Sequence, residues 1–146
     1  MELKIKKLRD GAKLPYYATD GAAAGDLYAL LDGPVTLSPG ERKLIPTGIS
    51  IALPDKNCVA VICARSGMAY KRGIALANGI GVIDSDYRGE IMVAVINNDE
   101  NEQTIENGER IGQMMILPVI RPEITEVSEL GDTERGAGGF GSTGIK

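Results

Sequence analysis

Residues 135–144, near the carboxyl terminus, combine groups that could bind a nucleotide. They contain five glycines and the only phenylalanine of the sequence, Phe140. A lone Phe is normally a core residue, but glycine-rich backbone has high conformational entropy and stays disordered unless something orders it. An ordering ligand would need a flat face for Phe140 and negative charge for Arg135, Ser142, Thr143 and the glycine amides. A nucleotide meets both requirements, and a flexible linker is the alternative.

A second stretch with chemical potential is the acidic turn within residues 81–91, where apolar runs flank Asp84, Asp86 and Tyr87. The two carboxylates could be Asx-turn residues that only stabilise the turn. The functional alternative makes one of them a general base on water and makes Tyr87 a surface for a sugar. The sequence has no histidine. A hydrolase built on this chain would therefore use a carboxylate base and a hard, oxygen-liganded metal ion such as Mg²⁺.

Three shorter turns carry further polar groups. Arg65, Ser66 and Gly67 follow an apolar run and offer a guanidinium, a hydroxyl and an amide. Together these groups suit an anion, although Arg-Ser-Gly is also a common surface turn. Gln113 has apolar neighbours, where an unpaired amide is costly, so it needs a structural partner or a ligand. Asp26 belongs to a Gly-Asp turn that enters a strand.

The elements that position these groups are predicted to be β-strands in a single domain. Nineteen glycines and seven prolines divide the 146 residues into short apolar runs, and only residues 66–72 suggest a turn of helix. Many short strands with frequent turns predict an all-β fold, a jelly-roll-like barrel or sandwich. Pro118 and Pro122 should end the folded body, and residues 123–130 could add an edge strand. Strands are expected at residues 2–8, 27–31, 34–37, 42–46, 48–53, 57–63, 74–77, 81–84, 90–97, 103–105 and 109–117.

Composition excludes several classes of protein. The net charge of −4 argues against nucleic-acid binding, because such binders usually present a basic face. No apolar stretch is long enough for a membrane span, and residues 1–7 lack the apolar run of a signal peptide, so a cytoplasmic protein is expected. Cys58 and Cys63 lie in one apolar run and would be about 16 Å apart along a strand, which is too far for a disulfide. Both are expected to be small hydrophobic residues on opposite faces.

Taken in order, these stretches resemble the five motifs of the dUTPase family, the homotrimeric dUTP diphosphatases, and the resemblance covers the whole chain. Two departures are small: Ala24 replaces a usual Gly, and Met68 stands where Leu is commoner. The resemblance implies a jelly-roll-like β-clip fold. The motifs are Ala-Gly-x-Asp-Leu at 23–27, Arg-Ser-Gly at 65–67, Gly-x-Ile-Asp-x-Asp-Tyr-x-Gly at 81–89 preceded by Asn78, Gly-Glu-Arg-Ile-x-Gln at 108–113, and Arg-Gly-x-Gly-Gly-Phe-Gly-Ser-Thr-Gly at 135–144.

The resemblance implies hydrolysis of dUTP to dUMP and pyrophosphate, which limits uracil in DNA and supplies dUMP for dTMP synthesis. It makes Asp84 the base that deprotonates water for attack on the α-phosphorus. Tyr87 would stack on the deoxyribose and exclude a 2′-hydroxyl, while Asn78 and nearby amides read the uracil edge. Arg65 and Ser66, with the amide of Gly67, would hold the phosphates.

The resemblance also implies a metal ion, a closing arm and an oligomer. Asp26 and Gln113 would hold waters on a Mg²⁺ ion that is bound mainly by the triphosphate. Residues 1–130 would form the β domain, and residues 131–146 a flexible arm that reaches a neighbouring subunit's site in a homotrimer. In that arm, Phe140 would cover the uracil, and the remaining contacts would come from Arg135, Gly141, Ser142 and Thr143.

Two other functions remain open from the sequence. One is a dCTP deaminase, or a bifunctional deaminase, of the same fold. That family uses a catalytic Glu and an Arg-Ser-Ser-type motif that this sequence lacks. The other is a nucleotide sensor or protein-binding module that keeps the fold without catalysis. The presence of Asp84, Tyr87, Arg135 and Phe140 argues against this second function.

Overall fold

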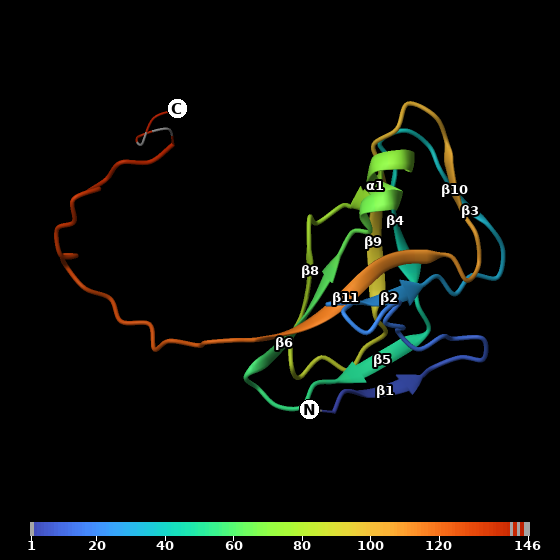
Figure 1. Ribbon diagram of the computed structural model, residues 1–146, viewed down its shortest axis with the longest axis horizontal. Helices are drawn as coiled ribbons and strands as arrows, with labels where there is room; N and C mark the ends of the chain where they lie inside the picture. Colours follow the sequence, from blue (N-terminus) through green and yellow to red (C-terminus); the bar gives the residue numbers. More distant parts are fainter. Residues whose placement is uncertain (1, 141, 143, 145–146) are drawn as a thin grey trace.

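The computed structural model describes residues 2–140, 142 and 144, and their fold is almost entirely β (Figure 1). A single short helix, α1, interrupts the strands between β6 and β7. The elements are β1 (Lys4–Lys7), β2 (Gly25–Tyr28), β3 (Val35–Leu37), β4 (Arg42–Pro46), β5 (Ile49–Ala52), β6 (Cys58–Cys63), α1 (Ser66–Arg72), β7 (Ile74–Leu76), β8 (Gly81–Ile83), β9 (Met92–Asn97), β10 (Gln103–Ile105) and β11 (Arg110–Pro118).

The strands form small antiparallel sheets around one core. One sheet has the order β2-β11-β6-β8 and another the order β4-β9-β7, while β1 pairs with β5 and β10 with β3. The larger sheets contribute alternate residues to the same apolar cluster, including Ile62 and Met114 from one and Val93 and Val95 from the other. Non-consecutive strands lie side by side throughout, as in a jelly roll, so the predicted fold class is confirmed.

The strands predicted between residues 2 and 117 are all present; those at 42–46 and 103–105 have the predicted ends, and the others have shifted ends. The largest shift concerns the strand predicted at 27–31, which is observed as β2 at Gly25–Tyr28. Its pairing explains the shift, because Asp26 lies opposite Gln113 of β11 and also bridges to Tyr16. Cys58 is buried, Cys63 is half-buried, and both are free thiols on opposite faces of β6, as predicted.

Helix α1 coincides with the helical turn predicted at 66–72. It ends because Gly73 adopts a left-handed conformation with φ of 63°, and the Gly73 N–H donates to Ala69 O at 3.1 Å. Met68 is the buried residue of the helix. The backbone also leaves no room at Gly73, since a Cβ there would lie 2.6 Å from the Asp99 amide nitrogen. This glycine therefore fixes where the helix stops.

Gly73→Ala should lower the free energy of unfolding by about 3 kcal/mol, which combines left-handed backbone strain with overpacking. Gly40→Ala is the matched control, because Gly40 also has a positive φ of 76° but a Cβ there would meet nothing within 4 Å. The control should lose only about 1 kcal/mol. Urea unfolding of both variants measures the difference. Equal losses would show that contact with residue 99 does not constrain the helix end.

The chain leaves the body after β11 and runs away from it as an extended segment (Figure 1). Among the described residues, the last backbone hydrogen bond to the body comes from the Val119 N–H, which donates to Asn57 O at 2.8 Å. The edge strand suggested at 123–130 is wrong, because these residues are exposed and have no strand partner. Pro122 cannot donate a backbone hydrogen bond, and no neighbouring sheet edge supplies one. Ile120, Ile124 and Leu130 are left exposed in this segment.

None of the helices among the described residues is both long enough and apolar enough to cross a membrane.

Candidate functional site

The turn after β8 presents the Asp84 carboxylate to solvent. The turn is closed by its backbone, since the Tyr87 N–H donates to Asp84 O at 3.1 Å. The Arg88 guanidinium adds bonds of 2.8 Å to Ser85 O and to Tyr87 O. Within the described part of the chain, no hydrogen bond to the carboxylate of Asp84 or Asp86 is found. The Asx-turn alternative therefore lacks support, and both carboxylates remain available.

Asp84 and Tyr87 line the same pocket, which has a volume of about 310 Å³. The pocket is walled by side chains of three different strands: Leu44 of β4, Val82 of β8 and Met92 of β9. Several of these apolar side chains are exposed, so the pocket offers apolar surface to a flat or cyclic ligand beside an accessible carboxylate. The two residues that the sequence predicts for water activation and sugar contact are brought together here. Ile83 and Glu90 complete the lining.

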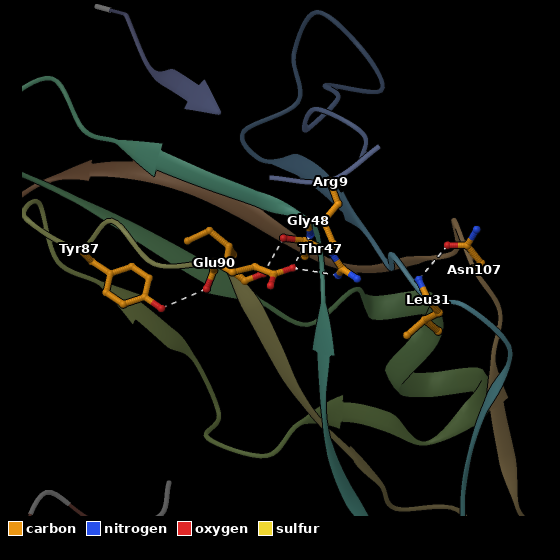
Figure 2. A network of polar contacts seen from close by, with 8 residues as sticks. Arg9, Leu31, Thr47, Gly48, Tyr87, Glu90 and Asn107 are labelled. Atoms are coloured by element: carbon orange, nitrogen blue, oxygen red, sulfur yellow. Dashed lines mark hydrogen bonds and ion pairs between the residues drawn. The ribbon is translucent and has the colours of Figure 1, made fainter. Parts of the chain in front are cut away.

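The Tyr87 ring folds back over its own turn. Its hydroxyl donates to Glu90 O at 3.1 Å, as Figure 2 shows. This position requires a glycine beneath the ring, because a Cβ on Gly89 would lie 2.4 Å from the Tyr87 hydroxyl oxygen. The motif glycine at 89 thus has a steric reason, and the ring has a defined orientation at the pocket edge.

A second cluster gathers cationic side chains around Asp26. This carboxylate is 7% exposed, and its two oxygens accept hydrogen bonds from Arg65 Nε at 2.8 Å and from Arg110 Nη1 at 3.0 Å. Such a charge-assisted pair orients both guanidinium groups. Sequence reasoning missed Arg110, although it belongs to the Gly-Glu-Arg-Ile-x-Gln motif. Its contact with Asp26 becomes visible only with the β2–β11 register, which pairs Arg110 with Tyr28, two residues from Asp26 on β2.

Gln113 also belongs to this cluster. Its Nε2 donates to Ala64 O at 3.0 Å, so the partner that its apolar neighbourhood required is at least in part structural. This hydrogen bond links β11 to Ala64, the residue that precedes Arg65. Asp26 and Gln113 are direct cross-strand partners in the β2–β11 ladder, so their side chains lie on one face of the sheet.

A pocket of about 370 Å³ lies beside this cluster and is strongly basic. Lys71 and Arg72 were not predicted as site residues from the sequence. The helical pattern alone predicts that their side chains face solvent. Arg72 is half-buried and pairs with Glu109, which joins α1 to the loop before β11. Ser66, at the start of α1, is exposed. The pocket is lined by Arg65, Gly67, Met68, Lys71, Arg72, Glu109 and Arg110.

The two pockets lie at opposite ends of the β6–β8 ladder and share no lining residue. Ala60 pairs with Ile83, so Asp84 lies near Val59, whereas Arg65 follows the other end of β6. Six residues of strand separate Val59 from Arg65, a span of about 20 Å. One chain therefore does not bring Asp84 and Arg65 together. Asn78 lies in the exposed turn between β7 and β8.

The described arm residues line neither pocket within the chain. Arg135 Nε donates to Gly138 O at 3.0 Å, and Phe140 is fully exposed. Ser142 is exposed as well. The predicted contacts of Gly141 and Thr143 concern residues outside the described part of the chain.

The donors suit a metal ion held through water better than one held directly. Among residues 2–140, 142 and 144, no group of three His, Cys, Asp or Glu side chains could form a metal site. Asp26 supplies one carboxylate, already paired with two guanidinium groups, and Gln113 supplies an amide oxygen beside it. Mg²⁺ commonly keeps several waters and takes its other ligands from substrate phosphates. The donor set fits that mode of binding.

Comparisons with known proteins identify the family to which the chain is similar. The dUTPase family model matches residues 10–144. The deoxyuridine 5′-triphosphate nucleotidohydrolase of Desulfitobacterium hafniense is 55% identical and covers 99% of this chain and 97% of its own length. That of Hydrogenobaculum sp. is 51% identical and covers 100% of both chains.

Solved structures of dUTPases have a similar fold. The Staphylococcus bacteriophage 80alpha dUTPase, solved with dUpNHpp, superposes with a TM-score of 0.89 at 27% identity and covers 99% of both chains. A variant dUTPase of the S. aureus phage phi11, for which a structural Mg(II) ion is described, shares the fold with a TM-score of 0.81 at 22% identity, over 90% of this chain and 100% of its own.

Proposed function

Because the chain belongs to the dUTPase family, we propose that it hydrolyses dUTP to dUMP and pyrophosphate with Asp84 as the general base. The observation that carries the proposal is the pocket shared by the exposed Asp84 carboxylate and the Tyr87 ring. A base beside a surface for a sugar is the arrangement that attack at the α-phosphorus of a nucleotide needs. The reaction keeps dUTP from serving as a DNA precursor and yields dUMP.

Asp84 acts on water in this proposal. Its carboxylate accepts a proton from a water molecule while the oxygen of that water forms a bond to the α-phosphorus. The bond from the α-phosphorus to the bridging oxygen breaks on the opposite side, and pyrophosphate leaves. The absence of histidine from the sequence is consistent with a carboxylate in this role. Asn78, in the β7–β8 turn, reads the uracil edge together with neighbouring backbone amides.

The phosphates bind at the basic pocket, where Arg65, Ser66 and Gly67 meet the negative charge. Asp26 holds Arg65 and Arg110 in place, which is supported by the hydrogen bond that each guanidinium donates to one of its oxygens. Mg²⁺ neutralises part of the triphosphate charge when bound. Asp26 and Gln113, which are cross-strand partners, would hold waters of that ion.

A complete site needs more than one chain. The distance of about 20 Å between the Asp84 end and the Arg65 end of β6 supports this step, because the α-phosphorus must lie close to the water held by Asp84 while its neighbours lie at the basic pocket. A closed three-fold assembly brings the Asp84 pocket of one subunit against the Arg65 pocket of the next. The homotrimer implied by the family resemblance has this symmetry.

The arm closes the site last. Residues 131–146 form the arm and residues 1–130 the β domain, and the described chain makes its last backbone hydrogen bond to the strands at Val119. Phe140 covers the uracil, Arg135, Ser142 and Thr143 contact the γ-phosphate, and Gly141 also binds the substrate. Full exposure of Phe140 in a single chain supports a docking partner outside that chain.

A substrate panel tests the reaction. The purified chain with Mg²⁺ should release dUMP and pyrophosphate from dUTP, with kcat/KM about 10²-fold or more above the values for dCTP and UTP. Chelation by EDTA should abolish turnover, and added Mg²⁺ should restore it. Deamination of dCTP would identify a deaminase instead. Binding of dUTP without product would identify a nucleotide sensor.

Tyr87→Ala should relax discrimination at the sugar more than at the base. We expect the ratio of kcat/KM for dUTP over UTP to fall on the order of 10- to 100-fold, because the ring no longer blocks a 2′-hydroxyl. The ratio for dUTP over dCTP should change less. Tyr70→Ala is the control, since Tyr70 is 92% exposed on α1 and lines neither pocket. An unchanged dUTP-over-UTP ratio in Tyr87→Ala would remove Tyr87 from the sugar pocket.

A further inference from the structure

The carbonyl that accepts the hydrogen bond of the Tyr87 hydroxyl belongs to a peptide group whose orientation is set by a second hydrogen bond. The acceptor is Glu90 O at 3.1 Å, and the N–H of that same peptide, on Ile91, donates to Ile49 O at 2.8 Å. In a trans peptide the N–H and C=O point in opposite directions. The bond to Ile49, at the start of β5, therefore aims the Glu90 carbonyl away from β5 and toward the tyrosine.

The Glu90 side chain gives this peptide a second anchor, which Figure 2 shows. Its carboxylate Oε1 accepts the Gly48 N–H at 2.7 Å and also the Arg9 Nη2 at 3.3 Å. A backbone N–H bonded to a carboxylate is a strong, charge-assisted hydrogen bond. Glu90 thus holds one end of the Tyr87 turn to the corner between β4 and β5.

That corner is rigid. Gly48 has φ of 71°, and a Cβ there would lie 2.3 Å from Leu30 Cδ2, so its backbone is enclosed. Thr47 is buried, and its hydroxyl donates to Ile91 O at 2.5 Å. Residues 84 and 86–89, by contrast, are exposed. The exposed turn therefore depends on the Glu90 contacts for a fixed position relative to the pocket.

We propose that Glu90 is a positioning residue for Tyr87 and, through it, for rejection of the ribose 2′-hydroxyl. The Glu90 carboxylate fixes the peptide that accepts the Tyr87 hydroxyl, and that bond sets how far the ring stands over the pocket. A ring that excludes one hydroxyl by contact must be held to a fraction of an ångström. The inference rests on the proposed function, in which Tyr87 borders the deoxyribose.

The test compares Glu90→Ala with Glu90→Gln, using the ratio of kcat/KM for dUTP over UTP. Glu90→Ala should lower this ratio about fivefold, the equilibrium effect of one typical hydrogen bond. Glu90→Gln keeps an acceptor for the Gly48 N–H and should retain most of the discrimination. Partial unfolding does not change the ratio, because the same folded molecules turn over both substrates. If Glu90→Ala does not fold, Glu90→Asp replaces it, since its side chain is too short for the same bond.

Glu41→Ala is the matched control. The Glu41 carboxylate also accepts a backbone N–H, from Ser38 at 2.8 Å, and pairs with Lys43 at 3.2 Å. The Ser38 N–H, and then Lys43, hold the pKa of Glu41 below its usual value, so it is ionised at neutral pH. Glu41 lies in the turn between β3 and β4 and lines neither pocket. Its loss should leave the ratio unchanged.

The double variant Tyr87→Ala/Glu90→Ala separates positioning from direct contact. If Glu90 acts through Tyr87, adding Glu90→Ala to Tyr87→Ala should leave the ratio where Tyr87→Ala alone put it. A further fall of similar size would show that Glu90 contacts the nucleotide itself and would overturn the proposal. An unchanged ratio in Glu90→Ala, with a lowered ratio in Tyr87→Ala, would overturn it too. An unchanged ratio in Tyr87→Ala would instead refute the sugar role in the proposed function.

Discussion

Asp84→Asn should lower kcat for dUTP hydrolysis about 10²- to 10⁴-fold, the usual contribution of a general base. The substitution is nearly isosteric, and the Asp84 side chain is exposed, so the fold should persist. Nucleotide binding should also persist, because the phosphate and sugar contacts of the proposed site come from other residues. Pyrophosphate release measures kcat, and titration with dUpNHpp measures binding.

Asp86→Asn is the control for this variant. Asp86 belongs to the same turn, is also exposed and does not line the Asp84 pocket. The substitution removes the same charge from the same region, so any general electrostatic effect on an anionic substrate appears in both variants. Asp86→Asn should stay within a few-fold of the wild-type rate. Equal losses in the two variants, or a small loss in Asp84→Asn, would exclude Asp84 as the base.

Much of the fold could be predicted because local signals agree with the final structure. Pro39-Gly40 and Pro54-Asp55 separate strands that the structure confirms on both sides of each turn. Gly73 ends α1 where left-handed backbone is required, directly after the predicted last residue of the helical turn. Such signals act within a few residues, so they can be read without knowledge of the sheet partners.

Contacts between residues far apart in the chain could not be predicted from the sequence. The ion pairs of Arg110 with Asp26 and of Arg72 with Glu109 join segments 84 and 37 residues apart. They follow from strand register and from the docking of α1, neither of which a motif encodes. The suggested strand at 123–130 failed for a related reason: a strand needs a partner edge, and the described part of the chain offers none there.

The proposed division of the site between subunits predicts the second large effect. Chains that lack residues 132–146 should keep their thermal stability, because the described arm residues are exposed and add nothing to the core. They should lose most activity, since Phe140 and Arg135 no longer close the site. Asp84→Asn chains should be inactive for a different reason. Neither defect affects the contacts that hold the β domain together.

Mixing the two inactive chains should restore about a quarter of wild-type activity. With random assembly at equal amounts, about three trimers in four contain both chains, and in a closed ring each of these pairs an intact Asp84 with a neighbour's intact arm at one site in three. Co-refolding allows the subunits to exchange, and native mass spectrometry confirms that mixed trimers have formed. If Asp84 and the arm of one site came from the same subunit, no pairing could repair a site and the mixture would stay inactive. Recovery near a quarter would therefore establish that the arm crosses to another subunit.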